Sequence, residues 1–295
     1  MKLQLRITLL FALSLSFSYG ILAQEVSGGF KTGLNFSRFE SDIAQDAMGN
    51  DLESYDFATG FHVGAIVNVK FTDYFGLRGE LLYSQKGTDY NFNGPSYFRL
   101  YNEDGSDNVT ANGNRSTTVN ITNSYIDIPI MAYIRFGRIE LAGGVSAGLL
   151  LRSTASGEIV MSDLTTTLGR PLEDLIISVD ANYFQDEYQI TDLVDPTFIT
   201  IFNSNFLAPS TIGGYYDAND TSDNLFRRID LGLNAQVGFY LNQGLFLSVR
   251  MNYGLSDLTI QNQDIDYSAL DGNNVILRDD NDRNLSIQTS IGFSF

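Results

Sequence analysis

The chain has 295 residues, no cysteine, and 35 acidic against 18 basic residues, for a net charge of −17. Without cysteine there can be no lipoprotein anchor, no disulfide and no thiolate metal site. The acidity argues against binding of nucleic acid, which needs a basic surface.

The chain begins with a sequence typical of an export signal. Lys2 and Arg6 accompany an apolar stretch over residues 7–17, and Ala23 before Gln24 offers a cleavage site. The stretch is too short for a membrane-spanning helix, and no other stretch reaches 18 consecutive apolar residues. We therefore expect residues 1–23 to be a signal peptide and residues 24–295 to form one β domain.

Eight later segments alternate apolar and polar residues. In the last of them, Leu285, Ile287 and Ile291 alternate with Asn284 and Ser286. A period of two residues predicts strands with two different faces. The predicted strands cover residues 28–37, 61–71, 75–86, 126–136, 139–152, 229–241, 245–255 and 284–295.

The connections between these segments are alternately short and long. The short ones are residues 72–73, 137 and 242–243, and the long ones are 38–58, 87–123, 153–227 and 257–283. This pattern favours an all-β fold, an eight-stranded antiparallel up-and-down transmembrane β-barrel in the outer membrane. Both termini would be periplasmic, the long loops would be outside, and lipid and lipopolysaccharide would surround the barrel. The alternative is a soluble exported β protein with its apolar face inward.

Charged residues on the polar strand faces predict a lumen network. Eight strands leave an interior that side chains fill, so charges there must pair. We expect a structural plug, with a proton or ion path as the alternative. The predicted lumen residues are Lys31, His62, Lys70, Arg78, Glu80, Asp127, Arg135, Glu140, Arg152, Asp230 and Arg250.

The only histidine, His62, is the natural candidate for a catalytic base. Such a base needs a nucleophile and an orienting acid, and no serine near it in the sequence has a motif context. We therefore predict that the protein is not an enzyme. A rim-located enzyme acting on lipid or peptide is the alternative.

The long connections hold 29 acidic and 7 basic residues, whereas the rest of the chain after residue 23 holds 6 acidic and 9 basic residues. Oxygen-rich stretches at 102–108, 217–223 and 271–282 are candidates for Ca²⁺, which takes six to eight oxygen ligands. None has the EF-hand spacing, and solvated turns are the alternative. We expect no other cofactor. The candidate ligands are Asp104, Asp107, Asp271, Asp279, Asp280 and Asp282.

The connection 153–227 is unusually rich in apolar residues. Pro171, early acids and apolar spacing near 3.6 predict a helix over 171–179, and residues 197–202 are apolar and β-prone. So much apolar surface must pack or bind something. We expect a self-packed cap over the barrel, with a partner surface or a ninth and tenth strand as alternatives.

Nearly all the predicted strands contain short motifs of a recognisable kind. They are GLNFS at 33–37, GFHVG at 60–64, ELLYSQKG at 80–87, YIDIP at 125–129, NYGLSD at 252–257 and GFSF at 292–295. These motifs resemble those of the PorT-like outer-membrane barrels of Bacteroidetes. The resemblance implies a role in protein transport by the type IX secretion system, with secretion-system proteins as partners. Phe293 and Phe295 at the chain end are the expected signal for the barrel-assembly machinery.

Overall fold

The computed structural model describes residues 25–103, 105, 108–184, 196–201, 203–216 and 224–295. Regular structure in these residues is entirely β. They contain no helix long and apolar enough to cross a membrane. The predicted signal peptide, residues 1–23, lies outside the described residues.

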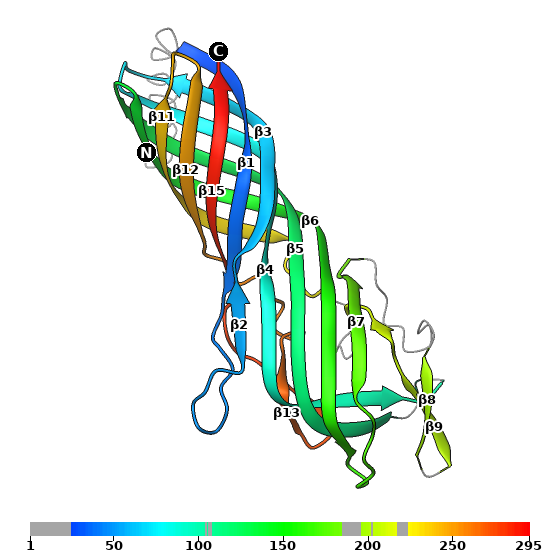
Figure 1. Ribbon diagram of the computed structural model, residues 1–295. Coiled ribbons are helices and arrows are strands. Elements are labelled where there is room, and N and C mark those ends of the chain that lie inside the picture. Colours follow the sequence, from blue (N-terminus) through cyan, green and yellow to red (C-terminus); the bar gives the residue numbers. More distant parts are fainter. Residues whose placement is uncertain (1–24, 104, 106–107, 185–195, 202, 217–223) are drawn as a thin grey trace, which may run out of the picture.

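Eight antiparallel strands close into a barrel, which confirms the predicted architecture (Figure 1). Around the barrel, each strand pairs with the next and the last pairs with the first. In this order the strands are β1 (Glu25–Glu40), β3 (Ala58–Lys70), β4 (Phe75–Tyr101), β5 (Asn108–Phe136), β6 (Ile139–Thr166), β11 (Ile229–Tyr240), β12 (Leu245–Gly254) and β15 (Arg283–Ser294).

The apolar face of the barrel strands points outward. Along β11, for example, Leu231, Leu233 and Val237 are exposed, whereas Asn234 and Gln236 are buried inside. Such a surface is unfavourable in water and is stable in lipid. The inward face is crowded, and Gly292 makes room for a ring: a Cβ there would lie 2.3 Å from Cζ of Phe246.

The three short connections lie at the same end of the barrel as the start of β1 and the end of β15, and we call this end the short-turn rim (Figure 1). One of them depends on Gly137, whose φ of +60° is unfavourable for a residue with a Cβ. Phe71 and Phe75 stack across another, with ring centroids 5.7 Å apart. Aromatic residues at this level are typical of the edge of the apolar band.

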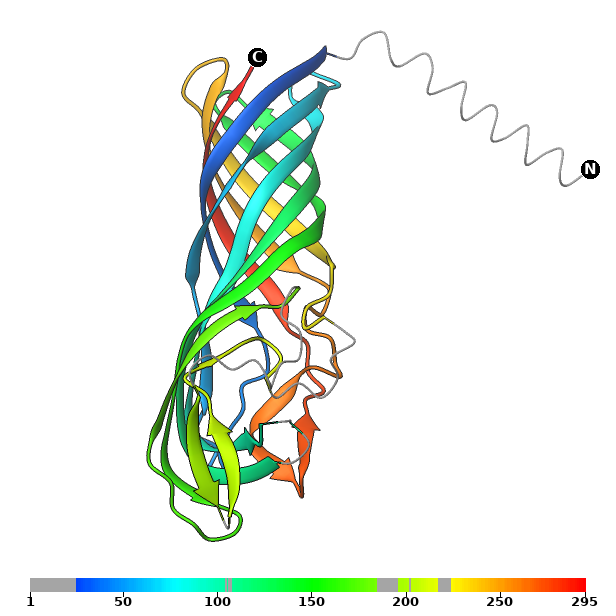
Figure 2. The same ribbon diagram turned by 90° about the vertical axis from the view of Figure 1, so that its right-hand side faces the viewer.

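At the other end, β4, β5 and β6 continue far past the barrel (Figure 2). The connection 87–123, predicted to be a loop, is a regular hairpin whose pairing runs from Gly87↔Thr122 to Tyr101↔Asn108. That prediction was wrong because the alternation here is mostly among polar residues: Thr117 is buried and Ser116 and Thr118 are exposed. Threonine favours strands, but hydrophobic periodicity does not detect it.

The extended strands form the base of a β-rich region that we call the head, which consists of the described residues within 41–57, 87–123, 153–228 and 256–282. Residues 153–166, also predicted as loop, belong to β6. The shorter strands of the head pair with these extensions or with each other. They are β2 (Glu53–Asp56), β7 (Leu175–Asn182), β8 (Thr197–Ile201), β9 (Ser204–Ala208), β10 (Thr211–Ile212), β13 (Ile265–Asp271) and β14 (Asn274–Leu277).

The helix predicted over 171–179 is absent, since β7 occupies most of that segment. Ile177 is completely buried and Ile176 is 66% exposed, which is the alternation of a strand. β7 pairs with β6 from Met161↔Leu175 onward. The edge offered by the extended β6 therefore outweighs the local helical signals, because pairing there satisfies a full row of backbone groups.

The head has a hydrophobic core of its own. Phe98, Ile159, Ile177 and Ile212 belong to one buried cluster, to which β4 to β10 all contribute. A second cluster lies at the junction with the barrel and includes Phe39, whose ring is 5.9 Å from that of Phe226. The described residues of 167–227 thus pack against the extended sheet, and they add no ninth barrel strand. The cap over the barrel stays a prediction.

Candidate functional site

The lumen near the short-turn rim contains an ion-pair network. Arg78 donates to both carboxylate oxygens of Glu140, at 2.6 and 3.1 Å, and Arg135 donates to the second of them at 2.8 Å. Tyr240 also donates to Glu140, at 3.1 Å. Arg78 and Glu140 are almost fully buried. A bidentate pair of this kind is strong and geometrically fixed.

A second network lies deeper in the barrel. Glu80 pairs with Lys31 at 2.9 Å and with Arg250 at 2.7 Å, and all three are buried. Arg250 also donates from Nε to Gln288 at 2.7 Å. The carboxylate of Glu80 therefore compensates two cations, and the side-chain amide oxygen of Gln288 accepts a hydrogen bond from Nε of Arg250.

His62 lies fully buried between two polar side chains. Its Nδ1 is 2.7 Å from Oδ1 of Asn35, and its Nε2 is 2.9 Å from Oγ of Ser290. Because the amide nitrogen of Asn35 donates to Ser84 and to the carbonyl of Phe61, its oxygen is the acceptor. Nδ1 therefore carries the proton and Ser290 donates to Nε2. Ser290, His62 and Asn35 thus lie in the order of nucleophile, base and orienting group in a catalytic triad. All three side chains, however, are buried in the packed lumen.

The third network lies at the head end of the barrel. Lys86 pairs with Asp127 at 3.1 Å and with Asp230 at 3.4 Å, and Asn284 donates to Asp230 at 2.9 Å. The ammonium of Lys86 also lies 4.9 Å from the ring centroid of Tyr125. Sequence reasoning left Lys86 out of the predicted charge network. Lys86 falls on the inward face of the predicted strand 75–86. The alternation of that segment could therefore have placed it in the lumen, opposite two acids that lacked a predicted partner.

The structure places most of the predicted lumen residues inside the barrel, with three exceptions. Lys70 is at the short-turn rim, where it pairs with exposed Glu25 and Asp73, and the side chain of Arg135 is 31% exposed. Arg152 is exposed on the outside, so its prediction as a lumen residue was wrong. The reason is an irregularity in the pairing of β5 and β6, where Ser124 faces Arg152 but Tyr125 faces Leu150. The extra residue reverses the alternation.

The candidate cation ligands do not come together in the described residues, which contain no group of three or more His, Cys, Asp or Glu able to hold a metal ion. Asp271 and Asp279 are exposed. Asp280 pairs with Arg278 at 2.7 Å, and Asp282 accepts a hydrogen bond from Thr259. Asp104, Asp107 and the stretch 217–223 lie outside the described residues.

The predicted assembly signal is at the end of β15. Phe293 and Phe295 both point outward, and Phe295 is 76% exposed. The backbone N–H of Phe295 donates to the carbonyl of Gly28 at 2.9 Å, which joins the last residue to the first strand. Recognition by the assembly machinery stays a prediction.

The head contains a partly open cavity of about 170 Å³ between the extended sheet and the segment around β13 and β14. One wall is apolar, with Val119, Ile159 and Val179 from three neighbouring strands. Aromatic rings line the barrel side, among them Phe39 and Phe226. Sequence reasoning missed this cavity because its lining comes from segments that were predicted to be loops.

The polar side of the cavity carries charged groups of both signs. Arg115 and Arg278 line it together with Asp264 and Asp282. Burial, followed by the hydrogen bond with Asp280 and the charge of Asp282, raises the pKa of Asp264 to about 8. Burial also raises the pKa of Asp282. These carboxyl groups therefore hold a proton more readily than exposed ones do.

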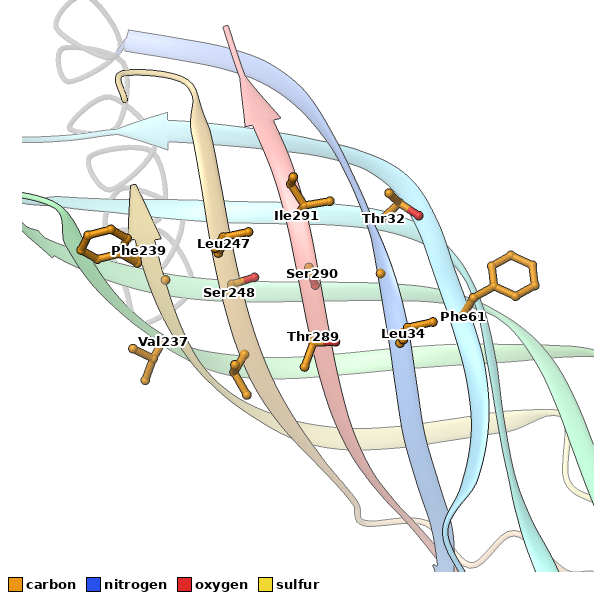
Figure 3. Close-up of a pocket in the computed structure, with 13 residues that line it drawn as sticks. Thr32, Leu34, Phe61, Val237, Phe239, Leu247, Ser248, Thr289, Ser290 and Ile291 are labelled. Carbon is orange, nitrogen blue, oxygen red and sulfur yellow. The ribbon is translucent and has the colours of Figure 1, made fainter. Parts of the chain in front are cut away.

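A larger hollow, of about 760 Å³, lies on the outer face of the barrel across β11, β12, β15, β1 and β3. Figure 3 shows Phe61 and Leu34 on one side of it and Val237 and Phe239 on the other. Since this face belongs to the apolar belt, acyl chains are its natural contents. It offers no group for chemistry beyond the hydroxyls of the strand residues that line it.

Comparison with known proteins agrees with the fold. Residues 22–259 match a family model described as an outer membrane protein beta-barrel domain. No curated protein matches the chain.

Solved structures of other barrels are distantly similar. The attachment invasion locus protein Ail of Yersinia pestis, solved with the heparin analogue sucrose octasulfate, is 12% identical with a TM-score of 0.36, covering 92% of this chain and 99% of that one. Neisserial surface protein A is 10% identical with a TM-score of 0.36 and the same coverage. OprG of Pseudomonas aeruginosa is 10% identical with a TM-score of 0.34, covering 92% and 97%.

Proposed function

Because the chain belongs to the outer membrane protein beta-barrel domain family, we propose that it is a non-enzymatic surface protein whose head binds a protein partner outside the cell. The barrel fixes the protein in the outer membrane. With the head outside the cell, both termini and the short turns are on the periplasmic side. Lipopolysaccharide then surrounds the barrel just below the head.

The observation that carries the proposal is the continuation of three barrel strands into the head. In residues 87–123 the hairpin stays in register over its whole length beyond the barrel. A protein that needed only a barrel would close these strands with turns at the rim. Strands of this length, stabilised by a separate hydrophobic core, hold a surface rigidly away from the membrane.

The exposed face of the extended sheet is suited to contact with a protein. On β5 it presents Asn114, Ser116, Thr118 and Asn120, and on β6 the neighbouring Ser156 and Glu158 are also exposed. Such a face is polar and stays soluble on its own. It offers hydrogen-bonding groups at the regular spacing of a sheet.

The lumen and His62 support a non-enzymatic role. His62 and its two hydrogen-bond partners are at most 6% exposed, so a substrate has no access to them in this packing. In its narrower form, which comes from the resemblance to PorT-like barrels, the proposal names the partner as a component of the type IX secretion system.

Crosslinking in intact cells tests the proposal, because the chain has no cysteine of its own. Single variants Ser116→Cys and Ser156→Cys place a thiol on the exposed face of the head, and Gln243→Cys places one at the short-turn rim as a control. We expect a membrane-impermeant maleimide to label the two head variants and not the control. A bifunctional reagent should then capture a secretion component from the head variants.

The experiment tests the orientation and the protein partner separately. Labelling of Gln243→Cys without labelling of the head would overturn the orientation. Correct labelling with capture of lipid or lipopolysaccharide alone would overturn the protein partner. A variant with a bulky charge on the same face, Thr118→Arg, should lose the captured partner and keep the labelling.

A further inference from the structure

The cavity in the head contains a buried cation that no carboxylate compensates. Arg115 is 7% exposed and lines the cavity. Its Nε donates to Thr117 at 2.9 Å, and its guanidinium carbon lies 4.2 Å from the ring centroid of Tyr267. In the part of the chain that the structure describes, Arg115 forms no ion pair, unlike Arg278 on the same cavity.

The acids that line the cavity, and Glu53 beside it, are engaged elsewhere. Glu53 accepts from Arg278 at 2.7 Å and from the hydroxyl of Tyr90 at 2.9 Å. Asp282 accepts from Thr259, and Asp264 shares a hydrogen bond with Asp280. A buried guanidinium without a counter-charge is costly, so its two terminal nitrogens form a site prepared for an anion.

The remaining lining determines the rest of the ligand. From Arg115, the inward face of β5 continues through Thr117 to Val119, and Ile159 and Val179 complete the apolar wall. The cavity volume, about 170 Å³, is close to the ~150 Å³ of an engineered apolar cavity that holds benzene. A ring or a short branched chain therefore fits this volume.

We propose that this cavity binds a small monocarboxylate with a compact apolar body, such as an arylacetate. The carboxylate accepts from the two terminal nitrogens of Arg115, and the body packs on the wall formed by Val119, Ile159 and Val179. The site is independent of the partner surface proposed above, which is on the opposite, exposed face of the same strands.

The test uses the full chain in lipid nanodiscs and three probes of nearly equal shape: phenylacetate, phenylacetamide and phenethylamine. Hydrogen bonds to a charged group contribute about 1.5–3 kcal/mol, so phenylacetate should bind at least about tenfold more tightly than the amide, and the amine should not bind. Arg115→Gln should remove this preference for the acid. Arg152→Gln, at an exposed arginine of the same strand system, should keep it. Saturation-transfer NMR or calorimetry measures the affinities.

A second readout separates a binding role from a structural one. Removing a charge that has no counter-charge should leave the thermal stability of the ligand-free head unchanged or raise it, whereas loss of a structural arginine would lower it. Arg115→Lys, which keeps the charge, replaces the glutamine variant if that variant does not fold. It should bind phenylacetate more weakly than the wild type does but still prefer the acid to the amide. Equal affinity for acid and amide, unchanged binding in Arg115→Gln, or no binding of phenylacetate overturns the proposal.

Discussion

The charged side chains buried in the barrel are arranged as three separate groups, each with its own counter-charges. Glu140 serves Arg78 and Arg135, Glu80 serves Lys31 and Arg250, and Lys86 serves Asp127 and Asp230. In each group one ion of one sign faces two of the other. Removal of Glu80 or Lys86 therefore leaves two buried charges without a partner, which is the costly way to break such a group.

The inward orientation of Lys86 and the outward orientation of Arg152 can be tested by substitution. Lys86→Met leaves Asp127 and Asp230 buried without their cation, and we expect the free energy of unfolding to fall by about 3–5 kcal/mol. Arg152→Met removes an exposed charge and should change it by no more than about 0.5 kcal/mol. Denaturant unfolding in micelles, followed by tyrosine fluorescence because the chain has no tryptophan, gives both values. An equal loss in the two variants would contradict the assigned side-chain orientations.

At the scale of the element, β6 joins two environments along one strand. In the barrel its even-numbered residues, such as Glu140 and Leu150, point inward, and beyond the irregularity at 150–152 its odd-numbered residues, such as Ile159 and Met161, are buried. The change of phase lets one strand line the lumen and then the core of the head. A strict period of two residues over its whole length would have exposed the apolar residues of one of these regions.

The segment of the head around β13 should depend on pH. The pKa of Asp264 is raised by burial to about 8, against 3.8 in an exposed chain, with Asp280, Asp282 and Arg278 as the charged groups facing it. The folded state therefore binds the proton more tightly than the unfolded state does. The proton on Asp264 therefore stabilises the folded state. This stabilisation is complete below a pH of about 4 and is lost as the pH rises toward 8.

Hydrogen exchange of the β13 amides at pH 5 and pH 8, corrected for intrinsic rates, measures this effect. We expect protection to decrease between the two values in the wild type and to decrease less in Asp264→Asn. The exposed Asp271→Asn is the matched control and should behave as the wild type. The same decrease in Asp264→Asn as in the wild type would refute the assignment to Asp264.

At the scale of the whole molecule, a barrel and a head share three continuous strands (Figure 2). The lumen is occupied by the ion-pair groups and by large side chains such as Phe246 and Met131, both at most 1% exposed. Eight strands leave no room for a water-filled channel beside side chains of this size.

Conductance measurements check this view of the lumen. The protein reconstituted in planar bilayers should give no unitary current steps, and a porin in the same bilayers is the positive control. Ion-selective steps would contradict the packed lumen and would favour the alternative of an ion path through the three charged groups.

The sequence by itself determined the barrel, its eight strands and most of the lumen charges. Alternation of apolar and polar residues is a local property, and in a closed barrel it fixes which side chains face lipid and which face inward. Lys31, Glu80 and Arg250 could thus be assigned to the lumen, although their mutual contacts could not.

Only the tertiary structure decided the head and the cavity with Arg115. The hairpin of β4 and β5 in the head alternates mostly among polar residues, and β7 becomes a strand because the edge of β6 is available to it. The irregularity that turns Arg152 outward depends on the pairing of two strands. Such features arise from contacts between segments far apart in the chain, so no local pattern of residues encodes them.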